Sequence, residues 1–143
     1  MLHQSLVFKI KEDLRRHEGV RYDVYLDTEG LKTAGVGHLL DQNAWEVGDE
    51  VDEAQVEAWF EEDVQTAIRD AADLVTIKHP ENVMRVMVNM AFNLGKPRLS
   101  KFKNMLKAVN AHDYNTAADE MIDSRWYNQV GRRSEELVEM MRG

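Results

Sequence analysis

Apolar residues near the start of the chain recur at every fourth position. They would share one face of a helix, and the set is Leu2, Leu6, Ile10 and Leu14. This spacing predicts an amphipathic α-helix, because residues four positions apart lie on the same helix face. Gly19 follows the stripe, and glycine often ends a helix by adopting a left-handed backbone. We therefore expect the first helix to stop near Gly19.

The pattern changes from helical spacing to alternation after this glycine. Every second residue is apolar in the next segment, which contains Val20, Tyr22, Val24 and Leu26. Alternation of β-branched and aromatic residues predicts a strand. The run Asp-Thr-Glu-Gly at 27–30 is typical of a tight turn. The residues that follow indicate a second, irregular strand, and they are Leu31, Thr33 and Val36.

Helical spacing returns and continues to the C-terminus. Asp52 is expected to cap a long helix, because Gln55 follows three positions later as in a capping box. Pro80 fits the first turn of the next helix, which should end at Gly95. Asp113 is expected to cap a later helix, and a final one should cover about 133–141. The apolar stripes comprise Val56, Trp59, Phe60, Val64, Ala67, Ile68, Val83, Met87, Met90, Ala91, Leu94, Phe102, Met105, Leu106, Val109, Ala117, Ala118, Met121 and Ile122.

These elements predict an α+β fold with segregated parts. A chain of 143 residues is about one domain long. We expect one domain, with a small β-hairpin lobe at about 18–50 and a larger helical lobe at 1–17 and 51–143. The most polar segment lies where the two lobes would meet, and clefts between lobes are common ligand sites.

Composition narrows the possible functions. The chain has no cysteine, which excludes disulfides and cysteine-bound metals. The formal charge of −8 argues against nucleic-acid binding, which needs a basic surface. Five basic residues and no acidic one lie in 96–107. This segment is either an ordinary solvated surface or the rim of a site for an anionic ligand.

Several kinds of site and segment are absent from the sequence. The Gly-Val-Gly at 35–37 lacks the third glycine of a dinucleotide fingerprint. The five histidines lack metal-ligand spacing, and no nucleophilic serine motif is present. No apolar run approaches the ~18 residues of a membrane span, and the N-terminus lacks the apolar core of a signal peptide. We expect no cofactor, no metal site and no membrane insertion.

Two carboxylic residues near the predicted hairpin suggest glycosidase chemistry. Such enzymes need one protonated carboxyl group and one ionised carboxylate beside the scissile bond. Glu18 at a helix end could be partly buried, and burial favours the protonated form. Asp27 at the turn would remain ionised, and the hydroxyl of Thr33 could help it hold a water. Taken alone, the two acids are better explained as solvated surface residues, because acidic residues make up a large share of this chain.

The order of these residues resembles the bacteriophage lysozymes, the phage-type muramidases of glycoside hydrolase family 24. The first matching block contains Glu18, Asp27-Thr28-Glu29-Gly30, Thr33 and Gly35-Val36-Gly37-His38-Leu39-Leu40. Later blocks, in family order, are Asn89-Met90-Ala91-Phe92-Asn93-Leu94-Gly95, then Phe102 with Asn104, and Ser124-Arg125-Trp126-Tyr127-Asn128-Gln129 followed by Arg133. The resemblance implies a lysozyme-like fold with an active-site cleft between its lobes.

The resemblance also implies an activity and three catalytic residues. The enzyme would hydrolyse the β-1,4 bond between N-acetylmuramic acid and N-acetylglucosamine in peptidoglycan. Glu18 would be the general acid, and Asp27 would be the carboxylate on the opposite side of the sugar. Thr33 would help to position water for an inverting displacement.

Further residues acquire roles only through the resemblance. Leu39 and Phe92 would line the cleft, with Asn93 nearby. Met105 and Glu120 occupy positions that contact glycan in some relatives, where a small or amide side chain is usual. The segment after His38 is short, which suggests a trimmed β-lobe. Arg133 would pair with Glu18, and His38 would form a structural ion pair with Asp63. Arg125 would face Glu29 across the cleft opening.

Two other functions remain open at the sequence level. A lytic transglycosylase cleaves the same bond but needs no water-activating carboxylate, so Asp27 and Thr33 favour hydrolysis. A catalytically silent or virion-associated glycan-binding module has no need for Glu18, Asp27 and Thr33 together. The resemblance favours an endolysin that acts as a monomer on peptidoglycan strands. We expect it to stay in the host cytoplasm until a holin permeabilises the membrane, and then to act on the wall or periplasm.

Overall fold

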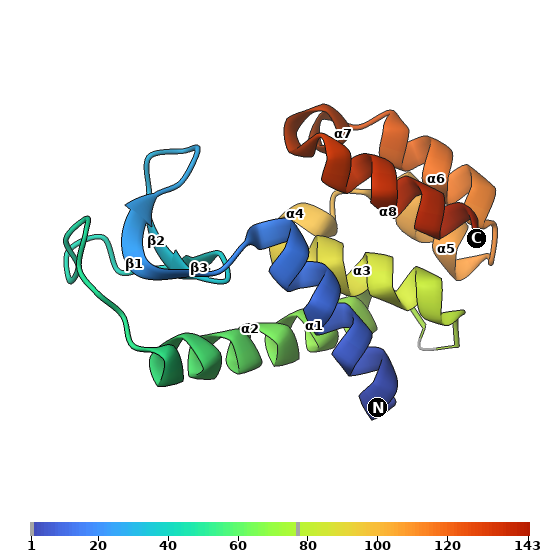
Figure 1. Cartoon of the computed structure of the whole chain (residues 1–143). Coiled ribbons are helices and arrows are strands. Elements are labelled where there is room, and N and C mark those ends of the chain that lie inside the picture. The colour runs from blue at the N-terminus through green and yellow to red at the C-terminus, as the bar shows by residue number, and fades with distance from the viewer. Residues whose placement is uncertain (1, 77) are drawn as a thin grey trace. The chain divides into compact units, whose positions relative to one another are not determined.

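The computed structural model of the protein describes residues 2–76 and 78–143. It contains the helices and the small sheet drawn in Figure 1. The element bounds are α1 Gln4–Glu18, β1 Arg21–Leu26, β2 Lys32–Gly35, β3 His38–Leu39, α2 Glu53–Leu74, α3 Glu81–Leu94, α4 Lys96–Leu99, α5 Lys103–Asn110, α6 Tyr114–Ile122, α7 Arg125–Val130 and α8 Arg132–Arg142. The α+β fold class predicted from the sequence is confirmed.

The chain divides into two compact units. The sheet unit is Lys11–Gln65, and the helical unit combines Met1–Ile10 with Thr66–Gly143. The sheet unit therefore includes the second half of α1 and the first half of α2 as well as the three strands. None of the helices in the described residues is long and apolar enough to cross a membrane.

The sheet has three antiparallel strands in the order β1-β2-β3. Tyr25 pairs with Thr33 between β1 and β2, and Ala34 pairs with His38 between β2 and β3. Residues near Val36, which were expected to continue a strand, instead form the turn into β3. Gly35 and Gly37 have φ angles of +64° and +61°, and such left-handed conformations reverse the chain direction.

The predicted alternation along β1 was only partly right. Val24 is buried, but Tyr22 and Leu26 are 46% and 53% exposed. Tyr22 and Leu26 lie near the two ends of β1, and the pairing of this strand with β2 shifts register between Arg21 and Tyr25. The core of the sheet unit instead comprises Val24, Ala34, Leu40, Val51 and Val56, with Val20, Trp45 and Trp59 packed against it.

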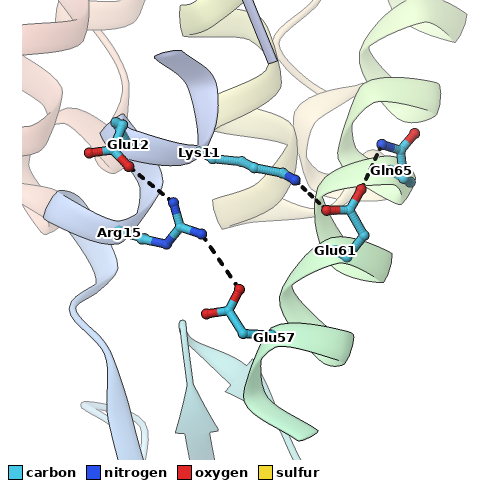
Figure 2. A network of polar contacts seen from close by, with 6 residues as sticks. All are labelled: Lys11, Glu12, Arg15, Glu57, Glu61 and Gln65. Atoms are coloured by element: carbon cyan, nitrogen blue, oxygen red, sulfur yellow. Dashed lines mark hydrogen bonds and ion pairs between the residues drawn. The ribbon is translucent and has the colours of Figure 1, made fainter. Parts of the chain in front are cut away.

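A network of charged side chains joins the C-terminal half of α1 to α2 within the sheet unit (Figure 2). Lys11 forms an ion pair with Glu61. Arg15 reaches Glu57 at 3.6 Å, and its guanidinium lies 4.8 Å from the centre of the Phe60 ring. These contacts hold the last turns of α1 in place, and the predicted cap of α2 is present, with the Gln55 N–H donating to Asp52 Oδ1 at 2.8 Å.

The helical unit has a core rich in methionine. The helix α8 packs against α3, α6 and α7, and α5 packs against α6. The predicted cap of α6 is present, because the Thr116 N–H donates to Asp113 Oδ1 at 3.2 Å. Pro80 precedes α3 as its N-cap rather than lying in its first turn, and Gly95 ends the helix as expected. The short helices α4 and α7 were not predicted.

Candidate active site

Asp27 follows β1 and organises the turn that leads to β2. Its Oδ1 accepts hydrogen bonds from the backbone N–H groups of Glu29 and Leu31, both at 2.9 Å. The backbone N–H of Asp27 donates to the Leu31 carbonyl at 2.9 Å. Within the described residues no hydrogen bond reaches Oδ2 of Asp27. One carboxylate oxygen is thus used by the backbone and the other can still accept a hydrogen bond from water.

Thr33 lies two residues into β2 and is 4% exposed. Its hydroxyl donates to the carbonyl of Leu31 at 2.9 Å. Since the N–H of the same Leu31 donates to Asp27, one residue connects the two predicted water-holding groups. With its proton donated to Leu31, the Thr33 oxygen can act only as an acceptor towards water.

Glu18 is the last residue of α1 and is half-buried, as the sequence suggested. Its side chain lies against Gly37, in the turn between β2 and β3. Tyr25 is sensitive to both candidate acids. Burial raises the pKa of its phenol, and the negative charges of Glu18 and Asp27 raise it further, against the opposing effect of Arg21. The two carboxylates therefore share an electrostatic environment, within which the phenol keeps its proton.

His38 and Asp63, which the resemblance pairs, are in contact. His38 Nδ1 and Asp63 Oδ2 are 2.7 Å apart. The imidazole also stacks on Trp59 with a ring-centre distance of 4.5 Å. This arrangement connects β3 to α2 and supports a structural role for His38. Leu39, the next residue, is 57% exposed, as a substrate-lining side chain would be before substrate binds.

The remaining predicted site residues belong to the helical unit. Asn93 Oδ1 accepts a hydrogen bond from Trp126 Nε1 at 2.8 Å. Arg133 Nε donates to Oδ1 of the buried Asn89 at 3.0 Å. Phe92 is half-buried on α3, and Arg125 is exposed on α7. The predicted pairing of Arg133 with Glu18 and the predicted placement of Arg125 opposite Glu29 join residues of different units and stay predictions.

A cavity of about 660 Å³ opens on the helical unit. Met105 and Glu120, the two positions that depart from the family pattern, both line it. Other lining residues are Leu94, Arg98, Lys101, Phe102, Lys103, Asn104, Asp123, Ser124, Arg125, Trp126 and Gln129. The basic segment singled out in the sequence therefore contributes three of its cations to one rim.

Sequence reasoning missed three residues that interact with predicted site residues of their own unit. Tyr25 was overlooked because alternation along β1 drew attention to its neighbours Val24 and Leu26. Asn89 and Trp126 were recognised only as parts of matching blocks, although their side chains hold Arg133 and Asn93. A buried asparagine in an otherwise apolar helix face was the available signal, since buried polar groups are nearly always hydrogen-bonded.

Comparison with known proteins identifies the family of the chain. Residues 15–142 match the family model for phage lysozyme. A probable T4-type lysozyme of Dictyostelium discoideum is 30% identical over 158 residues, which cover 93% of each chain. The endolysin of Salmonella phage P22 is 30% identical over 108 residues, covering 74% of this chain and 73% of its own.

One relative is a much larger virion protein. The pre-baseplate central spike protein Gp5 of Enterobacteria phage T4 is 34% identical over 151 residues, which cover 89% of this chain but 26% of the spike protein. The match therefore corresponds to one part of that protein. Because the family model spans almost the whole sequence, the chain belongs to the phage lysozyme family and is a lysozyme-like glycoside hydrolase that acts on peptidoglycan.

Proposed function

We propose that the chain is an endolysin-type muramidase that takes part in host cell lysis. It hydrolyses the β-1,4 bond between N-acetylmuramic acid and N-acetylglucosamine, with Glu18 as general acid and Asp27 and Thr33 as the groups that hold water. The observation that carries the proposal is the connection of Asp27 to Thr33 through Leu31. It leaves one acceptor oxygen on each side chain for a single water.

The proposed reaction is a single displacement. Glu18 donates its proton to the glycosidic oxygen as the bond from that oxygen to the anomeric carbon breaks. A water on the opposite face donates its two hydrogens to Asp27 and Thr33, so a lone pair of the water oxygen is available for attack. Asp27 takes the proton as the new carbon–oxygen bond forms. The anomeric configuration inverts because attack and departure occur on opposite faces.

Clearing of permeabilised Gram-negative cells tests the catalytic assignment. Glu18→Gln and Asp27→Asn should each lower the clearing rate by at least about 100-fold, the usual scale of acid–base catalysis. Asn is the informative replacement at position 27, because its amide oxygen can still accept from Glu29 and Leu31 and so preserve the turn. Asp27→Ser serves as a comparison in which the hydrogen bonds of the turn are weakened as well. Clearing by folded Glu18→Gln at the wild-type rate would refute the proposal.

The products distinguish hydrolysis from transglycosylation. Hydrolysis adds one water to the cleaved chain, whereas a transglycosylase leaves an anhydro sugar that is one water lighter. Mass spectrometry of digested peptidoglycan should show the heavier, reducing product. Proton NMR of the first product formed should show the inverted α-anomer, and initial formation of the β-anomer would instead indicate retention.

The second candidate is a virion-associated lysozyme, and the match to the T4 spike protein favours it. Expression in a Gram-negative host separates it from an endolysin. An endolysin should accumulate without lysis and should lyse the culture rapidly when a holin is co-expressed. Lysis without a holin would contradict release from the host cytoplasm, and detection of the chain in purified virions would favour the second candidate.

A further inference from the structure

Gly37 lies in the turn between β2 and β3, directly beside the carboxyl group of Glu18. A Cβ atom placed on this glycine would lie 2.6 Å from Glu18 Oε1, 3.0 Å from its Cδ and 3.5 Å from its Cγ. These are the three nearest atoms, and all belong to one side chain. The backbone at Gly37 therefore occupies the space next to the carboxyl group so closely that even a methyl group would collide with it.

Backbone conformation alone does not explain this glycine. Gly19, Gly30 and Gly48 also have positive φ angles, but a Cβ on any of them would meet no atom within 4 Å. A Cβ on Gly35 would contact the core side chain of Val56 at 3.3 Å. Gly37 is thus subject to two requirements, since its φ of +61° disfavours a side chain and the Glu18 carboxyl excludes one.

The Glu18 side chain is the part that would yield to a methyl group at position 37. The helix that carries Glu18 is held one turn away by Arg15, which contacts Glu57 of α2 (Figure 2). The guanidinium of Arg15 also lies over the ring of Phe60. The turn is held by pairing of Ala34 with His38. A terminal carboxyl, by contrast, moves by simple rotation of its χ angles. Crowding at position 37 would therefore move the acid and leave the fold in place.

We propose that Gly37 is a positioning residue for Glu18. The bare backbone at this position allows the carboxyl group to sit where it can protonate the glycosidic oxygen. This inference rests on the proposed role of Glu18 as general acid. Misplacement of a catalytic group by about 1 Å can lower a rate about 100-fold, so a small side chain at position 37 should act mainly on kcat.

The test compares Gly37→Ala with Gly48→Ala on peptidoglycan fragments. Gly48 has the more strained φ of +94° and open space around it, so its variant reports backbone strain without a collision. Gly37→Ala should lower kcat by about 100-fold and leave KM within about threefold, whereas Gly48→Ala should keep the wild-type kcat. Thermal melting should show that both variants fold. Equal kcat values for the two variants would overturn the inference.

A double-mutant cycle separates positioning from a general loss of activity. Glu18→Asp shortens the side chain and moves its carboxyl away from position 37. Adding Gly37→Ala should therefore lower kcat by less than about threefold when residue 18 is aspartate, but by about 100-fold when it is glutamate. Such a difference between the two backgrounds shows that the residues interact directly. An equal cost in both backgrounds would show that the substitution acts through the backbone.

Two further results keep the inference falsifiable. If Gly37→Ala fails to fold, Gly37→Asn replaces it, because asparagine tolerates positive φ better while still adding a Cβ. Failure of both to fold, beside a folded Gly48→Ala, would overturn the view that the carboxyl yields first. An active Glu18→Gln would refute the proposed function itself. An inactive Glu18→Gln with fully active Gly37→Ala would refute only the positioning role.

Discussion

At the scale of single residues, Asp27 serves the fold and the proposed chemistry with different oxygen atoms. Its Oδ1 accepts two backbone N–H groups and stabilises the turn. The turn therefore occupies one carboxylate oxygen and leaves Oδ2 to accept from the water of the proposed reaction.

Thr33 allows the hydroxyl and the methyl group to be tested separately. Thr33→Val keeps the shape and removes the hydroxyl, and Leu31 still accepts the N–H of Asp27. Thr33→Ser keeps the hydroxyl and loses a buried methyl, at a cost of about 1 kcal/mol in the free energy of unfolding. We expect Thr33→Val to lose about 100-fold in kcat and Thr33→Ser to stay within about tenfold of wild type.

Steady-state rates and urea unfolding check this prediction together. Thr33→Ser should have the higher kcat of the two variants. Thr33→Val should be at least as stable to urea as Thr33→Ser. If Thr33→Val is the more active variant, the hydroxyl does not hold the attacking water.

At the scale of elements, irregular features carry the site residues. The pairing of β1 with β2 shifts register between Arg21 and Tyr25, and beyond this shift Tyr25 pairs with Thr33. The end of α1 presents Glu18, and its position depends on contacts of Lys11 and Arg15 with α2 (Figure 2). Such surface ion pairs are individually weak. Their importance here lies in orienting the helix end that carries the candidate acid.

A cluster around His79 predicts a pH-dependent stability within the helical unit. Its Nδ1 lies 2.8 Å from the Tyr114 hydroxyl and its Nε2 lies 2.9 Å from Thr76 Oγ1. The ring of His112 is 4.8 Å away. Burial lowers the pKa of His79 from its usual 6.5, and the nearby His112 lowers it further. The folded state therefore favours the neutral imidazole more than the unfolded state does.

The sign of the effect follows from this difference. Above pH 6.5 both states hold a neutral His79, and its full contribution to stability is present. As the pH falls through 6.5 towards the folded pKa, the unfolded state binds the proton more readily and stability is lost. Urea unfolding can measure the free energy of unfolding between pH 7.5 and about 5. This free energy should fall less in His79→Gln than in wild type as the pH is lowered, and His112→Gln should fall by an intermediate amount. An unchanged decline in His79→Gln would contradict this.

At the scale of the whole molecule, an acidic protein presents a concentrated group of cations. The net charge is −8, yet Lys101, Lys103 and Lys107 are all exposed. None of the three forms an ion pair with another described residue, whereas Lys96 is paired with Asp73 at 2.8 Å. Unpaired cations can attract an anionic wall despite an unfavourable net charge, because attraction acts over about 10 Å at moderate salt.

Replacing Lys101, Lys103 and Lys107 together by glutamine should weaken co-sedimentation with purified cell walls at low salt. The difference from wild type should shrink at high salt, where charges are screened. Residual folding can be checked by thermal melting. Unchanged wall binding at low salt would show that this basic segment does not contribute.

The matched control removes three lysines whose charges are already paired. Lys9, Lys11 and Lys96 contact Glu81, Glu61 and Asp73 respectively. Replacing these three by glutamine changes the net charge by the same amount. Equal weakening by both triple variants would mean that net charge, and not the three unpaired lysines, determines binding.

Much of the fold could be predicted from local sequence. The stripe of Leu6, Ile10 and Leu14, the caps at Asp52 and Asp113 and the stop at Gly95 depend on residues within a few positions of each other. Helical periodicity and capping are local effects, so their signals survive in the sequence. The pattern of Glu18, Asp27 and Thr33 was also visible, although only matching blocks far along the chain distinguished it from ordinary surface polarity.

Folding alone determined how the candidate groups are held. Three features depend on strand register or on contacts between distant residues. They are the register shift in β1, the sharing of Leu31 by Asp27 and Thr33, and the close approach of the Glu18 carboxyl to Gly37. Periodicity cannot specify these features, because a shift of one residue in strand pairing reverses every side chain without changing the sequence pattern. Residue types therefore indicated the chemistry, and three-dimensional packing decided the position of each reacting atom.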